Sequence, residues 1–408
     1  MCYSKIRTDR NDGYKGVCIM KILITTDWYE PVVNGVVTSV LNLTKQLKEK
    51  GHEVKILTLS KTRHTYIEGD VIYVGSVGVG LIYPEARLKV AVIRQIIKGL
   101  IDWKPDIIHS QCEFSTFFMA KRIAEELQIP IVHTYHTVYE DYTHYFSPRV
   151  AWGKAIVQKM TRLLSEKVDY MIAPSKKIAD VLERYEVVCP VAVVPSGIDK
   201  EKYTRYIGTE WREKIRAKYG ISDDTTVLLY VGRLAKEKNI EELLHYQKRA
   251  AKYNTKLLIV GGGPYKETLV EETKNLGIED MVIFTGMIAP DQVAKYYQAG
   301  DLFVSASTSE TQGLTYVEAL AAGIPLLCRE DPCLDQVVQE DTNGWTYTDE
   351  ISFETSLSTW QQMLPDEKEW MRREAESSSE AFSSKTFGDK IEKIYIEECQ
   401  KPQICDTL

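Results

Sequence analysis

Two glutamates, Glu310 and Glu318, stand eight positions apart in the segment ETQGLTYVEAL, with Gly313 between them. A short apolar run before the segment predicts a strand, and the residues after Gly313 predict a helix that begins near Leu314. The first N–H groups of such a helix, together with its dipole, favour a phosphate. Glu310 would lie in the loop at the carboxyl end of the strand. Glu318 would lie about one turn into the helix, on the side that faces the loop.

A cationic turn follows another predicted strand, in VGRLAKEKN at 231–239. Its Arg233 and Lys238 suit a diphosphate leaving group, although a solvated basic turn would have the same composition. The next strand ends in GGGP, where Gly263 would let the backbone approach a ligand closely or would simply form a turn. No two aspartates stand at i and i+2, so a metal-bridged diphosphate is not predicted. A leaving diphosphate would instead depend on these cations and a helix N-terminus.

Two loops in the first half of the chain carry further candidates. In DWYEPVVNGVVTSV, Gly35 stands before a helix whose N–H groups suit an anion, although an ordinary turn would look the same. The chain lacks the GxGxxG fingerprint of dinucleotide-binding proteins. The segment HTYHTVYEDYTHYF has three histidines and four tyrosines at a predicted strand end. Such side chains offer flat faces and hydrogen bonds to a sugar, whereas the histidines lack the spacing of a zinc-binding helix.

The elements that must position these groups alternate between strand and helix, which predicts parallel sheets with right-handed crossovers. Expected strands in the first half are 20–26, 53–59, 106–109, 129–133, 170–173 and 191–194, with a helix at 38–50. The pattern restarts with strands at 226–232, 256–260, 281–284, 302–305 and 325–328, and a helix at 240–253. We therefore predict an α/β protein of two doubly wound domains. Its predicted parts are an extension at 1–19, domains at 20–199 and 200–380, and a segment at 381–408 whose helix packs back on the first domain.

The length agrees with this organisation, because a chain of 408 residues is longer than a domain with a single hydrophobic core usually is. The eight cysteines are scattered without a CxxC pair, which is typical of free thiols in a reducing cytosol. We expect a cytoplasmic protein, because no signal-peptide core and no run of roughly 18 apolar residues is present. Residues 1–200 hold 27 Lys and Arg against 22 Asp and Glu, whereas residues 201–408 hold 24 against 36. Only the first half is therefore expected to meet an anionic partner.

Two basic segments lie in that first half, at 87–101 and 149–167. Their apolar and cationic residues predict amphipathic helices on an anionic membrane surface, or else core helices with a solvated basic face. The first reading would bind the protein peripherally to a membrane. The candidate membrane or acceptor contacts are Arg87, Lys89, Arg94, Lys98, Arg149, Lys154, Lys159 and Arg162.

Taken together, these residues resemble the retaining GT4 glycosyltransferases, from Met20 to about Cys399. The motifs occur in the family's order: PVVNG, YHT, VPSGID, GRLAKEKN and the element from Glu310 to Glu318. The stretch TYHTVYEDYTHY further resembles the diacylglycerol glucosyltransferases of Gram-positive bacteria. This resemblance implies peripheral association with the inner face of the cell membrane. The resemblance implies the GT-B fold, in which two Rossmann-like domains face each other across a cleft.

The resemblance also implies roles by motif position. Glu310 would bind sugar hydroxyls and Glu318 the ribose, while Arg233 and Lys238 would contact the diphosphate. His136 would lie near the reacting sugar and Asp27 on the acceptor side, so that with Glu310 they form the candidate catalytic set. Gln312 stands where many members have an aromatic residue, a departure that bears on sugar preference. The implied donor contacts are Gly35, Arg233, Lys238, Gly263, Glu310, Gly313, Leu314, Thr315 and Glu318.

The implied activity is transfer of a hexose, first of all glucose from UDP-glucose, to the hydroxyl of diacylglycerol, with retention of configuration. We expect no metal cofactor and no nucleic-acid partner. The alternatives are a family member acting on another lipid, a soluble sugar or a polysaccharide, a non-catalytic two-lobed sugar-binding protein, and a nucleotide-sugar epimerase. Release of UDP that depends on an added acceptor would distinguish transfer from the last two.

Overall fold

The computed structural model describes residues 18–32, 34–78, 87–89, 93–140, 150–208 and 210–401, and it divides the chain into two compact units. The first unit contains the chain through Pro174, then Ala179–Val194 and the chain from Gly388 onward. The second contains Ser175–Ile178 and Pro195–Phe387. The chain therefore passes between the units at 174–175, 178–179, 194–195 and 387–388, so that the start of the helix after Pro174 belongs to the second unit. The sequence predicted boundaries at 199–200 and 380–381.

The first unit is built on an eight-stranded sheet in the order β10-β9-β8-β7-β1-β2-β4-β3. Its strands are parallel except β3, which pairs antiparallel with β4 at the edge. The sequence predicted all of them except β3 and β4. Their bounds are β1 Lys21–Thr25, β2 Glu53–Leu59, β3 Tyr66–Glu68, β4 Val71–Val74, β7 Ile107–Ser110, β8 Ile131–Thr134, β9 Tyr170–Ala173 and β10 Val191–Val193.

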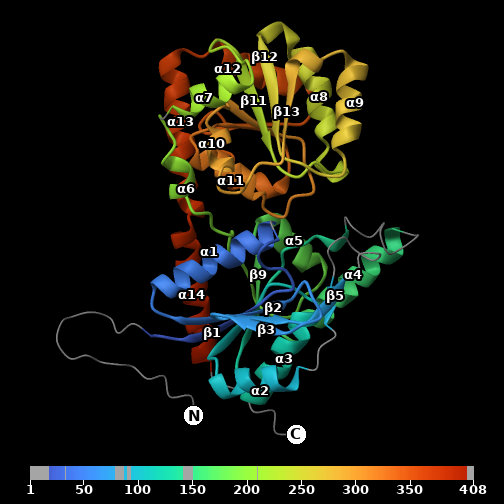
Figure 1. The fold of residues 1–408 in the computed structure, drawn as a ribbon, viewed down its shortest axis with the longest axis vertical. Helices are drawn as coiled ribbons and strands as arrows, with labels where there is room; N and C mark the ends of the chain where they lie inside the picture. The colour runs from blue at the N-terminus through green and yellow to red at the C-terminus, as the bar shows by residue number, and fades with distance from the viewer. Residues whose placement is uncertain are drawn as a thin grey trace, which may run out of the picture. The chain divides into compact units, whose positions relative to one another are not determined.

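Helices cover both faces of this sheet, with α1 on one side and α2 and α3 on the other (Figure 1). Helix α1 begins where the Asn34 side chain accepts a hydrogen bond from the Val37 N–H at 2.9 Å, which satisfies one free donor of the first turn. The C-terminal part of α14 packs on this unit, because the Tyr395 hydroxyl lies 2.6 Å from His109 Nδ1. The bounds are α1 Gly35–Glu49, α2 Arg94–Trp103, α3 Ser115–Leu127, α4 Val150–Ser165, α5 Lys176–Arg184 and α14 Ser384–Gln400.

The prediction of one amphipathic helix over 87–101 is wrong at its start. Arg87 and Lys89 lie on strand β6 (Arg87–Lys89), which pairs antiparallel with β5 (Ser76–Gly78), and α2 begins only at Arg94. The Arg87 guanidinium holds this ribbon in place, because it donates to the Ser60 carbonyl oxygen at 3.1 Å and to Ser76 Oγ at 2.7 Å. The second predicted basic helix is confirmed as α4, whereas Arg149 lies outside the described residues.

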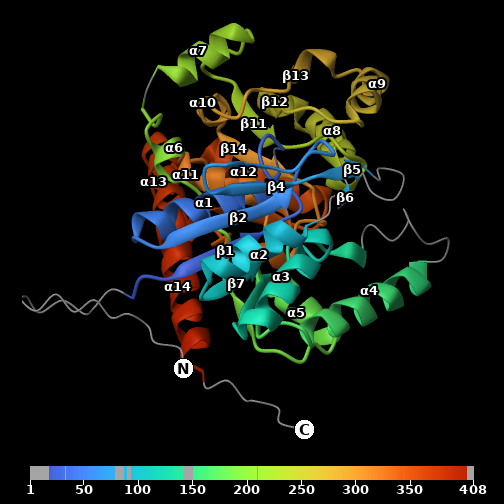
Figure 2. The ribbon, with the colours of Figure 1, turned by 60° about the horizontal axis from the view of Figure 1, so that its bottom comes forward.

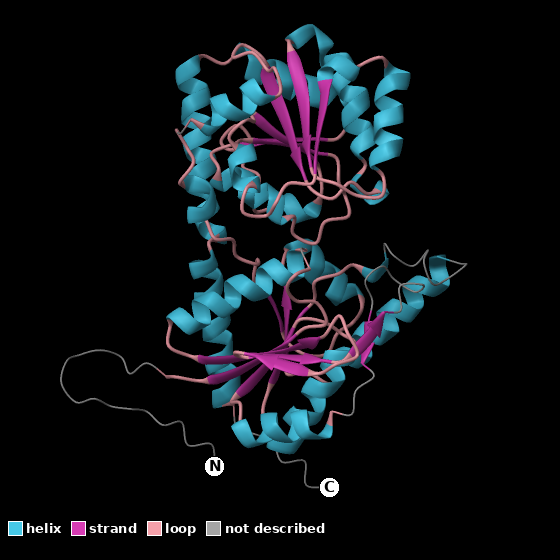
Figure 3. Cartoon of the chain, viewed as in Figure 1, coloured by secondary structure: helices cyan, strands magenta, loops and turns pink. Residues whose placement is uncertain are grey.

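The second unit is built on a six-stranded parallel sheet in the order β13-β12-β11-β14-β15-β16. Figure 3 shows strands of this sheet in magenta with helices around them. Strand β11 is buried throughout, and its residues alternate between two apolar cores, one on each face of the sheet. The sequence predicted every strand of this sheet except β16. The bounds are β11 Thr226–Val231, β12 Thr255–Val260, β13 Val282–Gly286, β14 Leu302–Ser305, β15 Leu326–Arg329 and β16 Gly344–Tyr347.

The loops at the carboxyl ends of β11 and β14 lie next to each other, because these two strands are neighbours in the sheet. One of these loops forms the 3₁₀ turn η2 (Lys236–Lys238) and the other leads into α11 (Leu314–Ala321). Among the described helices, none combines the length and the hydropathy needed to cross a bilayer. The remaining helices are α6 Glu201–Thr204, α7 Trp211–Lys218, α8 Ile240–Arg249, α9 Lys266–Leu276, α10 Val293–Tyr297, α12 Glu350–Gln362 and α13 Pro365–Ser378.

Candidate functional site

An ion pair joins the two neighbouring loops of the second unit. Lys238 Nζ donates to Glu310 Oε1 at 2.6 Å, and the two side chains are only 17% and 21% exposed. Ser309 Oγ donates to the Glu237 carbonyl oxygen at 3.1 Å, which ties the same loops a second time. Burial alone would raise the pKa of Glu310, but the charge and hydrogen bond of Lys238 lower that pKa below its ordinary value. Glu310 is therefore a carboxylate at neutral pH.

Gly313 supplies the start of α11 that the sequence predicted. Its φ of 72° lies in the left-handed region, and a Cβ there would stand 2.2 Å from Tyr316 Cε2, so only glycine fits. The N–H groups of Leu314 and Thr315 follow in the first turn, where a helix offers them no carbonyl partner of its own. This end of α11 therefore directs free N–H groups outward from the residues that follow Glu310. The predicted contacts of Gly313, Leu314 and Thr315 with a donor phosphate stay predictions.

Glu318 lies farther along α11, where its Oε2 accepts a hydrogen bond from the Tyr297 hydroxyl at 2.7 Å. Burial raises the pKa of this carboxyl, while hydrogen bonds from Tyr297 and Tyr203 and the nearby charge of Lys202 act in the opposite direction. A carboxylate held among hydroxyl donors is suited to exchanging one of them for a ligand hydroxyl. Its predicted contact with a ribose stays a prediction.

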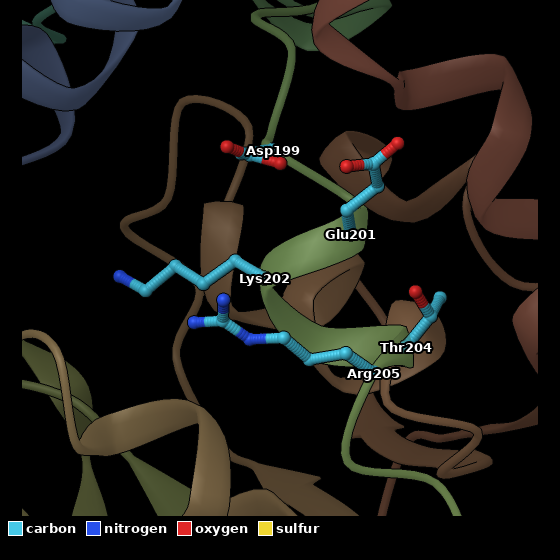
Figure 4. Close-up of a pocket in the computed structure, with 5 residues that line it drawn as sticks. All are labelled: Asp199, Glu201, Lys202, Thr204 and Arg205. Atoms are coloured by element: carbon cyan, nitrogen blue, oxygen red, sulfur yellow. The ribbon is translucent and has the colours of Figure 1, made fainter.

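A hollow of about 450 Å³ lies beside α6, close to Lys202 (Figure 4). The side chains of Lys202 and Arg205 extend the same way from α6, whereas Glu201 extends away from them. The sequence did not single out these cations. The residues that line the hollow are Asp199, Glu201, Lys202, Thr204 and Arg205.

Two other predicted donor contacts have clear structural surroundings. Arg233 is 53% exposed and pairs with Glu237 within its own turn. Gly263 permits close backbone packing, because a Cβ there would stand 2.2 Å from the Leu234 carbonyl oxygen. The loops that follow β11 and β12 are thereby held together, with the Leu234 N–H donating to the Gly262 carbonyl oxygen at 2.9 Å. The contacts of Arg233 and Gly263 with a donor stay predictions.

In the first unit, His136 lies at the carboxyl end of β8 beside the end of β7. Its Nε2 lies 2.7 Å from Oε1 of the buried Gln111. Burial lowers the pKa of His136 to about 4, against the opposing charge of Glu113, so the ring is neutral near pH 7. Glu113 accepts a hydrogen bond from the Tyr139 hydroxyl at 2.6 Å, and its other oxygen lies 3.4 Å from His133 Nε2.

Gln111 and Glu113 were not predicted, although a signal for them existed. They belong to the polar run QCE that follows the buried strand β7 directly. The residues 141–149, which include the third histidine of the predicted sugar-binding stretch, lie outside the described residues.

Asp27 is buried at the carboxyl end of β1 and binds the N-terminus of α3. Its carboxylate accepts from the Ser115 N–H at 3.1 Å, the Thr116 N–H at 2.8 Å and the Thr116 hydroxyl at 2.7 Å. Burial raises the pKa of Asp27 to about 6, against these three hydrogen bonds. The structure thus gives Asp27 a helix-capping contact, and its acceptor-side role stays a prediction. Gly35, the other candidate of this loop, is the exposed first residue of α1.

The described basic candidates of α2 and α4 are exposed: Arg94, Lys98, Lys154, Lys159 and Arg162. Helix α4 also leaves an apolar stripe exposed, with Trp152, Ile156, Met160 and Leu163 at 66%, 50%, 56% and 42%. These four positions share one face of the helix, while Val157 and Leu164 on the adjacent face are buried. In Figure 2, α4 projects from the edge of the first unit with α5 beside its C-terminal part, where Gln158 Nε2 donates to the Arg184 carbonyl oxygen at 3.2 Å.

Within the described residues, no group of three or more His, Cys, Asp or Glu side chains is arranged to hold a metal ion.

Comparisons with known proteins cover nearly the whole chain. A family model described as Glycosyltransferase Family 4 matches residues 33–202, and one described as Glycosyl transferases group 1 matches residues 211–377. An α-monoglucosyldiacylglycerol synthase from Streptococcus pneumoniae is 36% identical, over 93% of this chain and 86% of the relative. A protein of the same name from Acholeplasma laidlawii is 32% identical, over 93% of this chain and 97% of the relative.

Solved structures share the fold. HepE from Anabaena, in complex with UDP and glucose, has a TM-score of 0.72 at 17% identity, covering 93% of this chain and 100% of that chain. The likeness confirms the two-domain fold that the sequence predicted.

Proposed function

The chain belongs to glycosyltransferase family 4 and is a hexosyltransferase of the GT-B fold, and we propose that it transfers glucose from UDP-glucose to the hydroxyl of diacylglycerol. The product would be a membrane glycolipid. Two relatives that are named as α-monoglucosyldiacylglycerol synthases and that align over 93% of the chain support this acceptor and sugar. The S. pneumoniae relative also shares more than a third of its aligned residues with the chain.

The observation that carries the lipid acceptor is the surface of α4. Trp152, Ile156, Met160 and Leu163 expose an apolar stripe on a helix that also bears Lys154, Lys159 and Arg162. An anionic bilayer offers acyl chains for the stripe and headgroups for the cations. We propose that the protein binds peripherally at the inner face of the cell membrane.

The donor end of the reaction is supported by the loops of the second unit. Lys238 and the N–H groups at the start of α11 offer positive charge to a diphosphate beside Glu310, whose carboxylate can accept hydrogen bonds from sugar hydroxyls. Glu318, four residues into α11, would take the ribose hydroxyls. Arg233 is exposed and sits on the same turn as Lys238, where it would add a second cation.

In the proposed reaction, the bond between the anomeric carbon and the β-phosphate oxygen breaks while the acceptor oxygen bonds to the same face of that carbon. The acceptor's proton passes to the departing phosphate oxygen, and UDP leaves. Charge that develops on the diphosphate would be stabilised by Lys238, Arg233 and the α11 N-terminus rather than by a metal. Configuration would be retained because attack and departure share one face.

The test is an assay with UDP-glucose and diacylglycerol in vesicles, followed by NMR of the glycolipid linkage. An α-glucosyl product whose formation rises with anionic lipid supports the proposal. Turnover on soluble sugars only, or without any dependence on vesicles, contradicts the lipid acceptor. Conversion of the nucleotide-sugar without an acceptor would instead identify an epimerase.

A further inference from the structure

The loop that carries Glu310 is held from several sides by residues far away in the sequence. It runs from Thr308 to Gln312, between β14 and α11, and most of its side chains are small and polar. A loop of this composition has many conformations of similar energy, so fixing it is entropically costly. The contacts that fix it all lie within the second unit.

Gln312 makes the most specific of these contacts. It is 4% exposed, its Oε1 accepts from the Ser196 N–H at 2.8 Å, and its Nε2 donates to the Ser196 carbonyl oxygen at 2.9 Å. The carboxamide thus pairs with one backbone residue in the way a neighbouring strand would. Both of its polar atoms are engaged by the chain, so it is occupied as an anchor rather than available to a sugar.

Two further side chains hold the backbone on either side of Glu310. Ser175 Oγ donates to the Thr311 carbonyl oxygen at 2.5 Å. Lys177 Nζ donates to the Thr308 carbonyl oxygen at 2.7 Å while it pairs with the buried Asp331 at 2.8 Å. The positive charge of Lys177 also favours the ionised form of Glu310.

We propose that Gln312 is a positioning residue, which together with Ser175 and Lys177 fixes the Glu310 carboxylate where the hydroxyls of the donor sugar arrive. This inference rests on the proposed role of Glu310 in binding that sugar. Its physical basis is preorganisation: a loop that is already ordered loses less entropy when the donor binds.

The test compares Gln312→Met and Ser175→Ala with a matched control, Gln247→Met. Gln247 is also fully buried in the second unit, and its Nε2 donates to the Thr255 carbonyl oxygen at 3.1 Å and to Thr255 Oγ1 at 3.0 Å. All three changes remove buried hydrogen bonds, but the control does so on α8, away from the Glu310 loop. Calorimetric titration with UDP-glucose and with UDP measures the effect on binding without any acceptor.

We expect Gln312→Met to weaken UDP-glucose binding at least about tenfold and UDP binding less than about threefold, because only the sugar meets Glu310. Ser175→Ala should shift UDP-glucose binding in the same direction by a smaller factor. Gln247→Met should lower the melting temperature as much as Gln312→Met while leaving both affinities within about twofold. In a Glu310→Gln background, Gln312→Met should have less than about threefold further effect, because the residue acts through that carboxylate.

Equal affinities of Gln312→Met and the original protein for UDP-glucose would overturn the positioning role. Equal losses of UDP-glucose affinity in Gln312→Met and Gln247→Met would overturn it as well. So would a Gln312→Met change that weakens binding by the same factor in the Glu310→Gln background as in the original protein. If the original protein does not bind UDP-glucose at all, the donor in the proposed function is wrong. That result is distinct from a failure of the anchor.

Discussion

The apolar stripe on α4 yields a quantitative prediction for membrane binding. Replacing Ile156 and Met160 together by alanine removes about three non-hydrogen atoms from each side chain. About half of each side chain is exposed, 50% of Ile156 and 56% of Met160. At about 0.8 kcal/mol per buried methylene, insertion of these exposed portions into a bilayer is worth about 2.5 kcal/mol. The double variant should therefore partition into vesicles roughly 60-fold less well than the original protein.

The assay is sedimentation with vesicles of phosphatidylcholine with and without phosphatidylglycerol, at low and high salt. The loss caused by the double variant should be the same at both salt concentrations, because it is hydrophobic. The contribution of Lys154, Lys159 and Arg162 should instead weaken as salt screens it. Ile351→Ala is the matched control, since Ile351 on α12 is 78% exposed but belongs to the second unit.

The reasoning would be refuted by either of two results. One is a double variant that partitions within about twofold of the original protein while both remain folded. The other is an equal loss in Ile351→Ala, which would mean that exposed apolar residues act without regard to their place on the surface.

Further predictions concern the carboxylates and their partners. Glu310→Gln and Lys238→Met should each reduce turnover at least roughly tenfold with melting temperatures close to the original; turnover like that of the original protein would remove the residue from the catalytic set. Glu318→Gln should raise the KM for UDP-glucose while kcat changes less, so an unchanged donor KM would count against its ribose contact. Because the pKa of Asp27 is raised from 3.8 to about 6 by burial, its contribution to stability is present below pH 3.8 and is lost as pH rises through 6. The unfolding free energy of the original protein, relative to that of Asp27→Asn, should fall by about 3 kcal/mol over that pH range. Chemical denaturation at a series of pH values measures both free energies, and a difference between the two proteins that does not change with pH would contradict the prediction.

The sequence predicted the framework of the fold because buried parallel strands are continuous apolar runs. The predicted strands at 170–173 and 302–305 coincide with β9 and β14. It did not predict β4 or β16, which are short and owe their strand structure to pairing with β2 and β15. It also extended an apolar run into a helix at Arg87, where side-chain hydrogen bonds to Ser60 and Ser76 stabilise a ribbon instead.

The residues of the candidate site were likewise predicted only in part. Groups that stand at strand ends, such as Glu310 and Lys238, were found from their position, and the structure brings these two into contact. The partners that hold such groups were not found, because they come from distant parts of the chain. Gln312 pairs with Ser196, 116 positions away, and Asp27 caps a helix 88 positions away. No local pattern encodes such pairs.

The central claim is transfer of glucose from UDP-glucose to a lipid hydroxyl at a membrane surface. Its most direct test is to incubate the purified chain with UDP-glucose and vesicles that contain diacylglycerol, and to determine the linkage of the extracted lipid by NMR. The account predicts an α-linked glucosyl diacylglycerol, formed with one UDP released per glucose transferred. A β-linked product would contradict retention, and UDP release without any glycolipid would contradict the acceptor.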